Sequence, residues 1–212
     1  MLKKYFDSDV RIVLAIIIVV EFIYNYLLSK SILSQKVLYN SLATEMTLEQ
    51  IDIALEATQT FSWVYYISIP LAIIASILLI SLCLNIGSLL LNYNFSFKSL
   101  FNIVTKSYII YTIGKVIMLV VLNSYEVDAL TDLAYLPRFS VYDFFDADTL
   151  PSWAIFPLQL LSVFELIFIL LLATGLNFLK KRSIPRWVLF VLATYGLGML
   201  IVSILVIFLV YI

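Results

Sequence analysis

The stretch WVYYISIPLAIIASILLISLCLNIGSLLL, residues 63–91, decides the fold. It contains no aspartate, glutamate, lysine or arginine, and it is longer than the ~20 helical residues that cross the ~30 Å hydrocarbon core of a bilayer. Four further apolar runs occupy residues 12–28, 107–123, 154–178 and 187–211. Because 63% of the residues are apolar and the mean hydropathy is +1.07, a soluble domain could not bury this surface. The sequence therefore predicts an all-α membrane protein, a bundle of five transmembrane helices in a single domain over residues 1–212.

Two features refine this prediction near the first span. The first run carries Glu21 and lacks a small-residue cleavage site, so we expect a retained span and not a signal peptide. Further on, Thr47-Leu48-Glu49-Gln50 has the form of a capping box, and apolar residues follow at helical spacing. This pattern predicts a short amphipathic helix over about residues 48–59, lying on the outer surface.

The charged residues between the runs alternate in sign. Basic residues precede the first run and separate the second from the third and the fourth from the fifth, whereas acidic residues fill the other two connections. By the positive-inside rule, the N-terminus is expected in the cytoplasm and the C-terminus outside. The basic set is Lys3, Lys4, Arg11, Lys98, Lys106, Lys180, Lys181, Arg182 and Arg186; the acidic set is Glu45, Glu49, Asp52, Glu56, Glu126, Asp128, Asp132, Asp143, Asp146 and Asp148.

Composition and motifs argue against several classes of protein. A net charge of −1, with the basic residues at span edges, is unsuited to nucleic acid. Histidine, the commonest metal ligand and general base, is absent, and the single cysteine, Cys83, lies in an apolar run. The chain lacks a Gly-x-Ser-x-Gly elbow, a zinc-binding His-Glu-x-x-His pair and a phosphate-binding loop, and no serine is marked as partner to Lys115. We therefore expect no enzymatic activity and no cofactor.

Two charged clusters permit a binding role beside a topological one. Asp143, Asp146 and Asp148 offer oxygen ligands to a cation such as calcium, but they lack the glycine turn and final glutamate of an EF-hand loop. Charge bias between the two sides of the membrane explains them more simply, so no metal site is expected. The basic run at residues 180–182 either attracts anionic lipid or only fixes orientation.

Three ionisable residues interrupt the spans, namely Glu21, Lys115 and Glu165. At ~1.5 Å per residue from the membrane edges, all three reach about the same midplane layer. Each has polar neighbours at helical spacing. The predicted intramembrane polar cluster consists of Glu21, Asn25, Tyr111, Lys115, Ser162 and Glu165.

This cluster has two interpretations. Two carboxylates that share one lysine leave a proton whose position responds to either side of the membrane, which favours a proton or ion relay in a small transporter. Alternatively, the three side chains form a buried polar clasp that fixes which helices touch. The clasp is the simpler hypothesis, because in the sequence only Pro70 suggests the broken helices of transporters.

Two stretches resemble a known family. NIGSLLLNYNFSFKSLFNIV at 85–104 is similar to the end of the second span and the basic linker of the Yip family, the five-span Ypt/Rab-interacting membrane proteins, and especially of its bacterial branch. LSVFELIFILLLATGL at 161–176 resembles the fourth span of that family. The pattern extends over most of residues 60–210. The long cytosolic N-terminal region and the Asp-Leu-Tyr-Gly-Pro motif of eukaryotic members are missing, so Rab binding is not expected.

The resemblance implies a protein of the bacterial inner (plasma) membrane with a cytoplasmic N-terminus. It implies a non-enzymatic adaptor or scaffold, or an accessory subunit of a transport or envelope complex. The expected partners are the lipid bilayer and another membrane protein or a second copy of the chain. A small ion-coupled transporter that uses the Glu21, Lys115 and Glu165 layer is the alternative.

Overall fold

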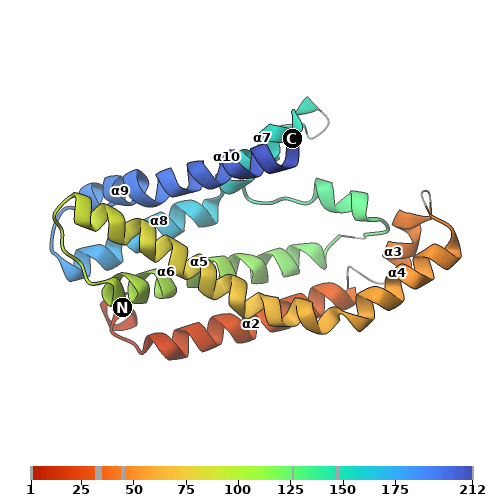
Figure 1. Cartoon of the computed structure of the whole chain (residues 1–212), viewed down its shortest axis with the longest axis horizontal. Coiled ribbons are helices and arrows are strands. Elements are labelled where there is room, and N and C mark those ends of the chain that lie inside the picture. The colour runs from red at the N-terminus through yellow and green to blue at the C-terminus, as the bar shows by residue number, and fades with distance from the viewer. Residues whose placement is uncertain (1, 32–34, 44–45, 126, 147–148, 212) are drawn as a thin grey trace.

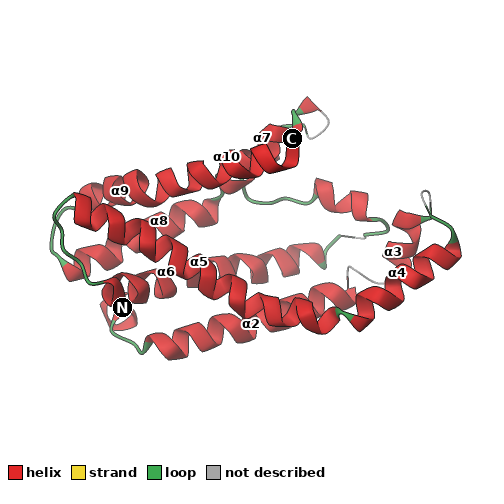
Figure 2. Ribbon diagram, in the orientation of Figure 1, coloured by secondary structure: helices red, strands yellow, loops and turns green. Residues whose placement is uncertain are grey.

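The computed structural model describes residues 2–31, 35–43, 46–125, 127–146 and 149–211. In these ranges the chain is helical and forms no strand, as predicted; Ser140 and Ser162 form an isolated bridge (Figure 2). The elements are α1 (Leu2–Phe6), α2 (Val10–Ser31), α3 (Gln35–Leu42), α4 (Leu48–Thr60), α5 (Ser62–Leu90), α6 (Phe97–Leu122), the 3-10 helices η1 (Leu130–Tyr135) and η2 (Val141–Phe144), α7 (Ser152–Leu160), α8 (Val163–Leu179), α9 (Ile184–Val191), the π-helical turn η4 (Leu192–Gly196) and α10 (Leu197–Tyr211).

Four helices among the described residues are long and apolar enough to cross a membrane: α2, α5, α6 and the continuous run from α9 to α10. The fourth predicted span, 154–178, differs from the prediction, because it is divided into α7 and α8. The two described ends of the chain lie at opposite ends of the bundle (Figure 1). The fold is that of an integral membrane protein.

Helix α6 lies at the centre of the bundle and packs against α2, α5 and α8 (Figure 1). The core between these helices is apolar, with Ile77, Val104 and Phe168 fully buried. Two glycines allow close approach: a Cβ on Gly87 would lie 1.9 Å from Thr194 Cγ2, and one on Gly175 would lie 2.6 Å from Ile103 Cγ2. These contacts join α5 to η4 and α8 to α6.

Helix α6 begins earlier in the sequence than the apolar run indicated. Ser96 caps the helix by accepting a hydrogen bond from the Ser99 amide, so α6 starts at Phe97 and not at residue 107. Lys106 therefore lies inside the helix, buried, and not in a basic connection as predicted. Its ammonium donates to the Phe6 carbonyl at the end of α1, where a cation satisfies an otherwise unpaired carbonyl.

The predicted amphipathic helix, α4, lies at the end of the molecule opposite the start of α6 (Figure 1). The Gln50 amide donates to Thr47 Oγ1 and the Thr47 amide donates to Gln50 Oε1, which confirms the capping box at the start of α4. Helix α4 leads into α5 with only Phe61 between them, and it buries Ile51. The Tyr39 hydroxyl of α3 donates to the Asp52 carboxylate of α4, which raises the pKa of Tyr39. Glu45 lies outside the described residues.

Candidate functional site

The candidate site begins at the break between α7 and α8. Helix α8 has 17 residues and so rises ~25 Å, less than the ~30 Å of the hydrocarbon core. The non-helical backbone at Leu161 and Ser162 therefore falls within the apolar layer or at its outer edge. Ser162 ends the break by capping α8: its hydroxyl accepts a hydrogen bond from the Glu165 amide at 3.1 Å.

A segment of the connection between α6 and α7 supplies the hydrogen bonds that the break leaves open. The Val141 amide donates to the Leu161 carbonyl and the Val163 amide donates to the Phe139 carbonyl, each at 2.9 Å. Irregular backbone at this depth requires such partners, because lipid offers none. Residues 139–141 of this connection therefore complete the backbone hydrogen bonding at the break.

Asp143 holds this segment in shape. Its carboxylate accepts hydrogen bonds from the amides of Arg138 and Ser140, at 3.0 and 3.2 Å, around Phe139, whose φ is +56°. The acidic loop was weighed as a metal site, but the described residues contain no group of three potential ligands. Asp148 and Glu126 lie outside the described residues.

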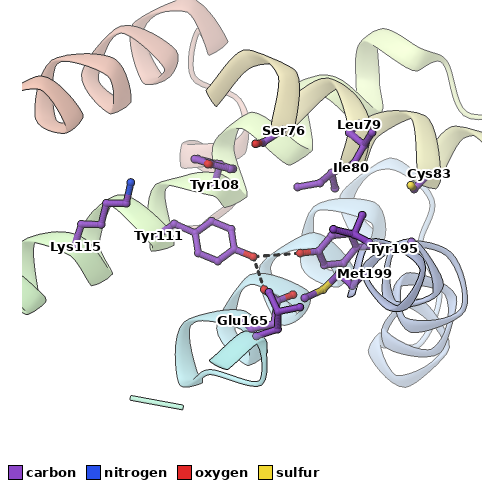
Figure 3. A pocket seen from close by; sticks show the side chains of 13 residues that line it. Ser76, Leu79, Ile80, Cys83, Tyr108, Tyr111, Lys115, Glu165, Tyr195 and Met199 are labelled. Atoms are coloured by element: carbon purple, nitrogen blue, oxygen red, sulfur yellow. Dashed lines mark hydrogen bonds between the residues drawn. The ribbon is translucent and has the colours of Figure 1, made fainter. Parts of the chain in front are cut away.

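Glu165 lies in the first turn of α8 and is 6% exposed. Tyr111 of α6 donates its hydroxyl to Glu165 Oε2 at 2.6 Å, and the hydroxyls of Tyr111 and Tyr195 are 3.4 Å apart. Figure 3 shows these three side chains pointing toward one another. Tyr195 lies in the π-helical turn η4, an irregularity often found at functional sites. Glu165 Oε1 is buried and has no hydrogen-bond partner among the described residues.

Glu21 and Lys115 form a separate ion pair between α2 and α6. Lys115 Nζ lies 2.7 Å from Glu21 Oε2. The packed face of α2 repeats every four residues, with Val13, Ile17 and Glu21 buried, whereas Ile16 and Val19 are exposed on the face suited to lipid. Glu21 is 2% exposed, and its Oε1 also lacks a partner among the described residues.

Asn25 stabilises the same end of α2. Its amide donates to the Glu21 carbonyl one turn earlier at 2.8 Å, and its oxygen accepts from the Tyr65 hydroxyl of α5 at 2.6 Å. The Lys115 ammonium also lies 5.7 Å from the ring centroid of Tyr24. The polar contacts around Glu21 thus connect α2 to both α5 and α6.

A cavity of about 430 Å³ lies beside Glu165. Its lining residues come from α5, α6, α7, α8, η4 and α10, and Leu79 and Ile80 form an apolar side opposite the polar residues (Figure 3). Lys115 lines it too, but Figure 3 shows its ammonium directed away from Glu165. The polar lining residues are Ser76, Tyr108, Tyr111, Lys115, Glu165 and Tyr195.

A second cavity of about 270 Å³ lies at the helix break. Ser162 and Gln159 line it together with Arg138, whose guanidinium lies 5.1 Å from the ring centroid of Tyr142. Both cavities are lined by Tyr111 and Lys115. These two side chains of α6 therefore stand between the two spaces.

The structure brings the six predicted cluster residues into two groups. Glu21, Lys115 and Asn25 form one group, and Glu165, Tyr111 and Ser162 form the other. The interpretation that both carboxylates share Lys115 is wrong in its contacts: among the described residues, Lys115 forms an ion pair with Glu21, and Glu165 binds Tyr111 instead.

Sequence reasoning missed Tyr195, Tyr65 and the structural role of Asp143. The only signal for Tyr195 is the polar and small triplet Thr194-Tyr195-Gly196 inside an apolar run. Tyr65 had the same weak signal, as a hydroxyl within a span. The signal for Asp143 is the capping-box pattern Ser140-Val141-Tyr142-Asp143, in which the Asp143 carboxylate accepts a hydrogen bond from the Ser140 amide.

No family model, curated protein or solved structure matches the chain. The fold and the buried polar groups define an integral membrane protein, and what it does rests on the site itself.

Proposed function

We propose that the chain is a small proton-coupled permease of a bacterial plasma membrane, in which a solute and a proton compete for the Glu165 carboxyl group. The observation that carries this proposal is the buried, unpartnered Oε1 of Glu165 beside a cavity of about 430 Å³. Cavities of ~300–1,000 Å³ are typical of small-molecule sites. An ionised carboxylate without a cation is costly to bury, and a proton or a cationic group in the cavity neutralises it.

The helix break supports transport over a purely structural role. Discontinuous helices with irregular backbone beside a cavity are a recurrent feature of secondary transporters. Here the break at Ser162 and the π-helical turn at Tyr195 converge on Glu165. The two cavities on either side of Tyr111 and Lys115 provide two compartments, and a rotation of these side chains would change which of them reaches Glu165.

No covalent chemistry belongs to this proposal. A serine–lysine dyad needs a neutral lysine near a serine, and Lys115 is held in an ion pair with Glu21 at 2.7 Å. The same ion pair suits the clasp interpretation, because it joins α2 to α6 through Glu21, which is buried, and Lys115, whose side chain is 44% exposed. In the proposal, Glu21 and Lys115 hold the scaffold and Glu165 is the working carboxyl group.

A test uses purified protein in liposomes that contain a pH-sensitive dye. Solutes from four classes, namely permanently charged cations, zwitterions, anions and neutral sugars, are added outside in turn. We expect one class to drive proton movement that saturates with solute concentration and that protein-free liposomes lack. If no class moves protons beyond the protein-free control, the permease proposal fails.

An adaptor or scaffold is the second candidate, supported by the Yip-like pattern and by large apolar side chains on the outer elements. Leu48 and Ile53 of α4 and Phe144 of η2 are 69%, 61% and 86% exposed. Such residues suit a second membrane protein or a second copy of the chain. Purification in mild detergent should then recover a stable complex, and a strictly monomeric chain without a partner would count against it.

The proposed orientation places α1 and the connections 91–96 and 180–183 in the cytoplasm. In a Cys83→Ala background, we expect Thr149→Cys to react with an impermeant maleimide in intact cells, since Thr149 is exposed in the outer loop. Ser183→Cys, exposed at the opposite end, should react only after permeabilisation. Labelling of Ser183→Cys in intact cells would reverse the orientation.

A further inference from the structure

We propose that the cavity beside Glu165 takes a lipophilic organic cation, which enters sideways from the lipid between α5 and α10. This inference rests on the proposed permease function and names its class of solute. It is carried by three features of the cavity: the charge of its polar groups, the aromatic rings in its wall, and the position of its mouth.

When it is ionised, Glu165 gives the cavity a negative charge that no described lysine or arginine neutralises by an ion pair. Glu165 Oε2 accepts from Tyr111, and Oε1 has no partner in the described part of the chain. The two cations that line these cavities have other contacts. Lys115 pairs with Glu21 and points away from Glu165 (Figure 3), and Arg138 stacks on Tyr142 in the second cavity. A positively charged ligand is the one that this end of the cavity favours.

Three tyrosine rings stand around the same space. Tyr108, Tyr111 and Tyr195 line the cavity, and Tyr108 and Tyr111 contact each other edge to face with ring centroids 5.1 Å apart. An aromatic face attracts a cation by ~0.5–2 kcal/mol, and more so where water is excluded. A carboxylate combined with several rings recognises a bulky cation whose charge is spread over apolar groups.

The remaining wall and the mouth are apolar. Ile80 and Met199 line the interior, whereas Leu79 of α5 and Val202 of α10 line the cavity and are also 54% and 38% exposed. Because the exposed sides of these helices face lipid, the cavity opens toward the hydrocarbon between α5 and α10. A solute that partitions into the bilayer reaches Glu165 by this route without crossing the polar ends of the bundle.

The test compares two ions of matched shape and opposite charge. Tetraphenylphosphonium and tetraphenylborate are titrated separately into the purified protein in detergent, and binding is measured by equilibrium dialysis. We expect saturable binding of the phosphonium and none of the borate. Glu165→Gln should weaken phosphonium binding about 30-fold or more, because it removes one partner of a buried charge pair.

Two variants of Tyr195 distinguish the contribution of its ring to phosphonium binding from the contribution of its hydroxyl. Tyr195→Leu removes the ring and should weaken binding about fivefold, whereas Tyr195→Phe keeps it and should change binding less than about twofold. Glu49→Gln, an exposed carboxylate of α4, is the charge-matched control. If Glu165→Gln does not fold, the difference in phosphonium binding between Tyr195→Leu and Tyr195→Phe still tests the inference.

Three outcomes overturn the inference: no phosphonium binding, equal binding of the borate, or wild-type affinity in Glu165→Gln. The failure of the inference differs from the failure of the function. Proton movement driven by another solute class, without phosphonium binding, would refute the cation and leave the permease. Charge-selective phosphonium binding without proton movement in liposomes would support the cation site and refute the permease function.

Discussion

Replacing Lys115 with methionine is expected to lower the free energy of unfolding by about 3–5 kcal/mol, because it leaves the Glu21 carboxylate buried without its partner. Glu21 is 2% exposed, and the Lys115 ammonium 2.7 Å away is its ion-pair partner. Methionine has nearly the volume of the lysine stem, so loss of packing contributes little. Thermal melting of the purified protein in one detergent measures the change.

The double variant Glu21→Gln/Lys115→Met is the control for this prediction. A neutral glutamine does not need a cation, so the double variant should recover much of the stability that Lys115→Met loses. Glu165→Gln combined with Lys115→Met should show no such recovery, since Glu165 forms its contact with Tyr111. The clasp is refuted if the double variant melts no higher than Lys115→Met, or if Lys115→Met melts like the wild-type chain.

The second large effect is expected from replacing Glu165, which should change transport and leave the stability of the fold nearly unchanged. Glu165→Gln should abolish solute-driven proton movement in liposomes, because an amide carries no exchangeable acid proton. The amide oxygen still accepts the hydrogen bond from Tyr111, so the free energy of unfolding should change by less than about 1 kcal/mol. The dye-loaded liposome assay and thermal melting are applied to the same preparation.

Tyr111→Phe and Glu49→Gln are the matched controls for Glu165. Tyr111→Phe removes the donor to Oε2 but keeps the acid, so proton movement should persist with an altered dependence on pH. Glu49→Gln removes a carboxylate that is exposed outside the spans and should leave transport unchanged. Transport at the wild-type rate in Glu165→Gln would contradict the proposed role.

The spans were predictable because an apolar run of this length has few structures open to it other than a membrane-spanning helix. Residues 63–91 became α5 at 62–90, and the capping box at Thr47 placed the start of α4. The side of α2 that carries Glu21 was also accessible, since Val13, Ile17 and Glu21 recur at four-residue spacing. Helix bounds and the buried side of a helix can be read from local sequence patterns.

The helix break was not predicted, because residues 154–178 are apolar almost throughout. Gln159 and Ser162 are the polar residues in the sequence around the break. The residues that complete its hydrogen bonding, 139–141, belong to a different and earlier segment of the chain. The sequence likewise did not indicate that Glu165 lies apart from the Glu21–Lys115 ion pair. Depth in the membrane follows from counting residues, but which face meets which neighbour depends on packing between α6, α2 and α8.

The most direct test of the central claim is labelling by dicyclohexylcarbodiimide, a lipid-soluble reagent that adds to protonated carboxyl groups. Membranes that contain the protein are treated with the reagent, and the modified residue is located by mass spectrometry of peptides. The account predicts modification of Glu165, whose Oε1 is unpartnered beside the cavity, and none of Glu21, whose carboxylate is held by Lys115. An unmodified Glu165, or a modified Glu21 in its place, would contradict it.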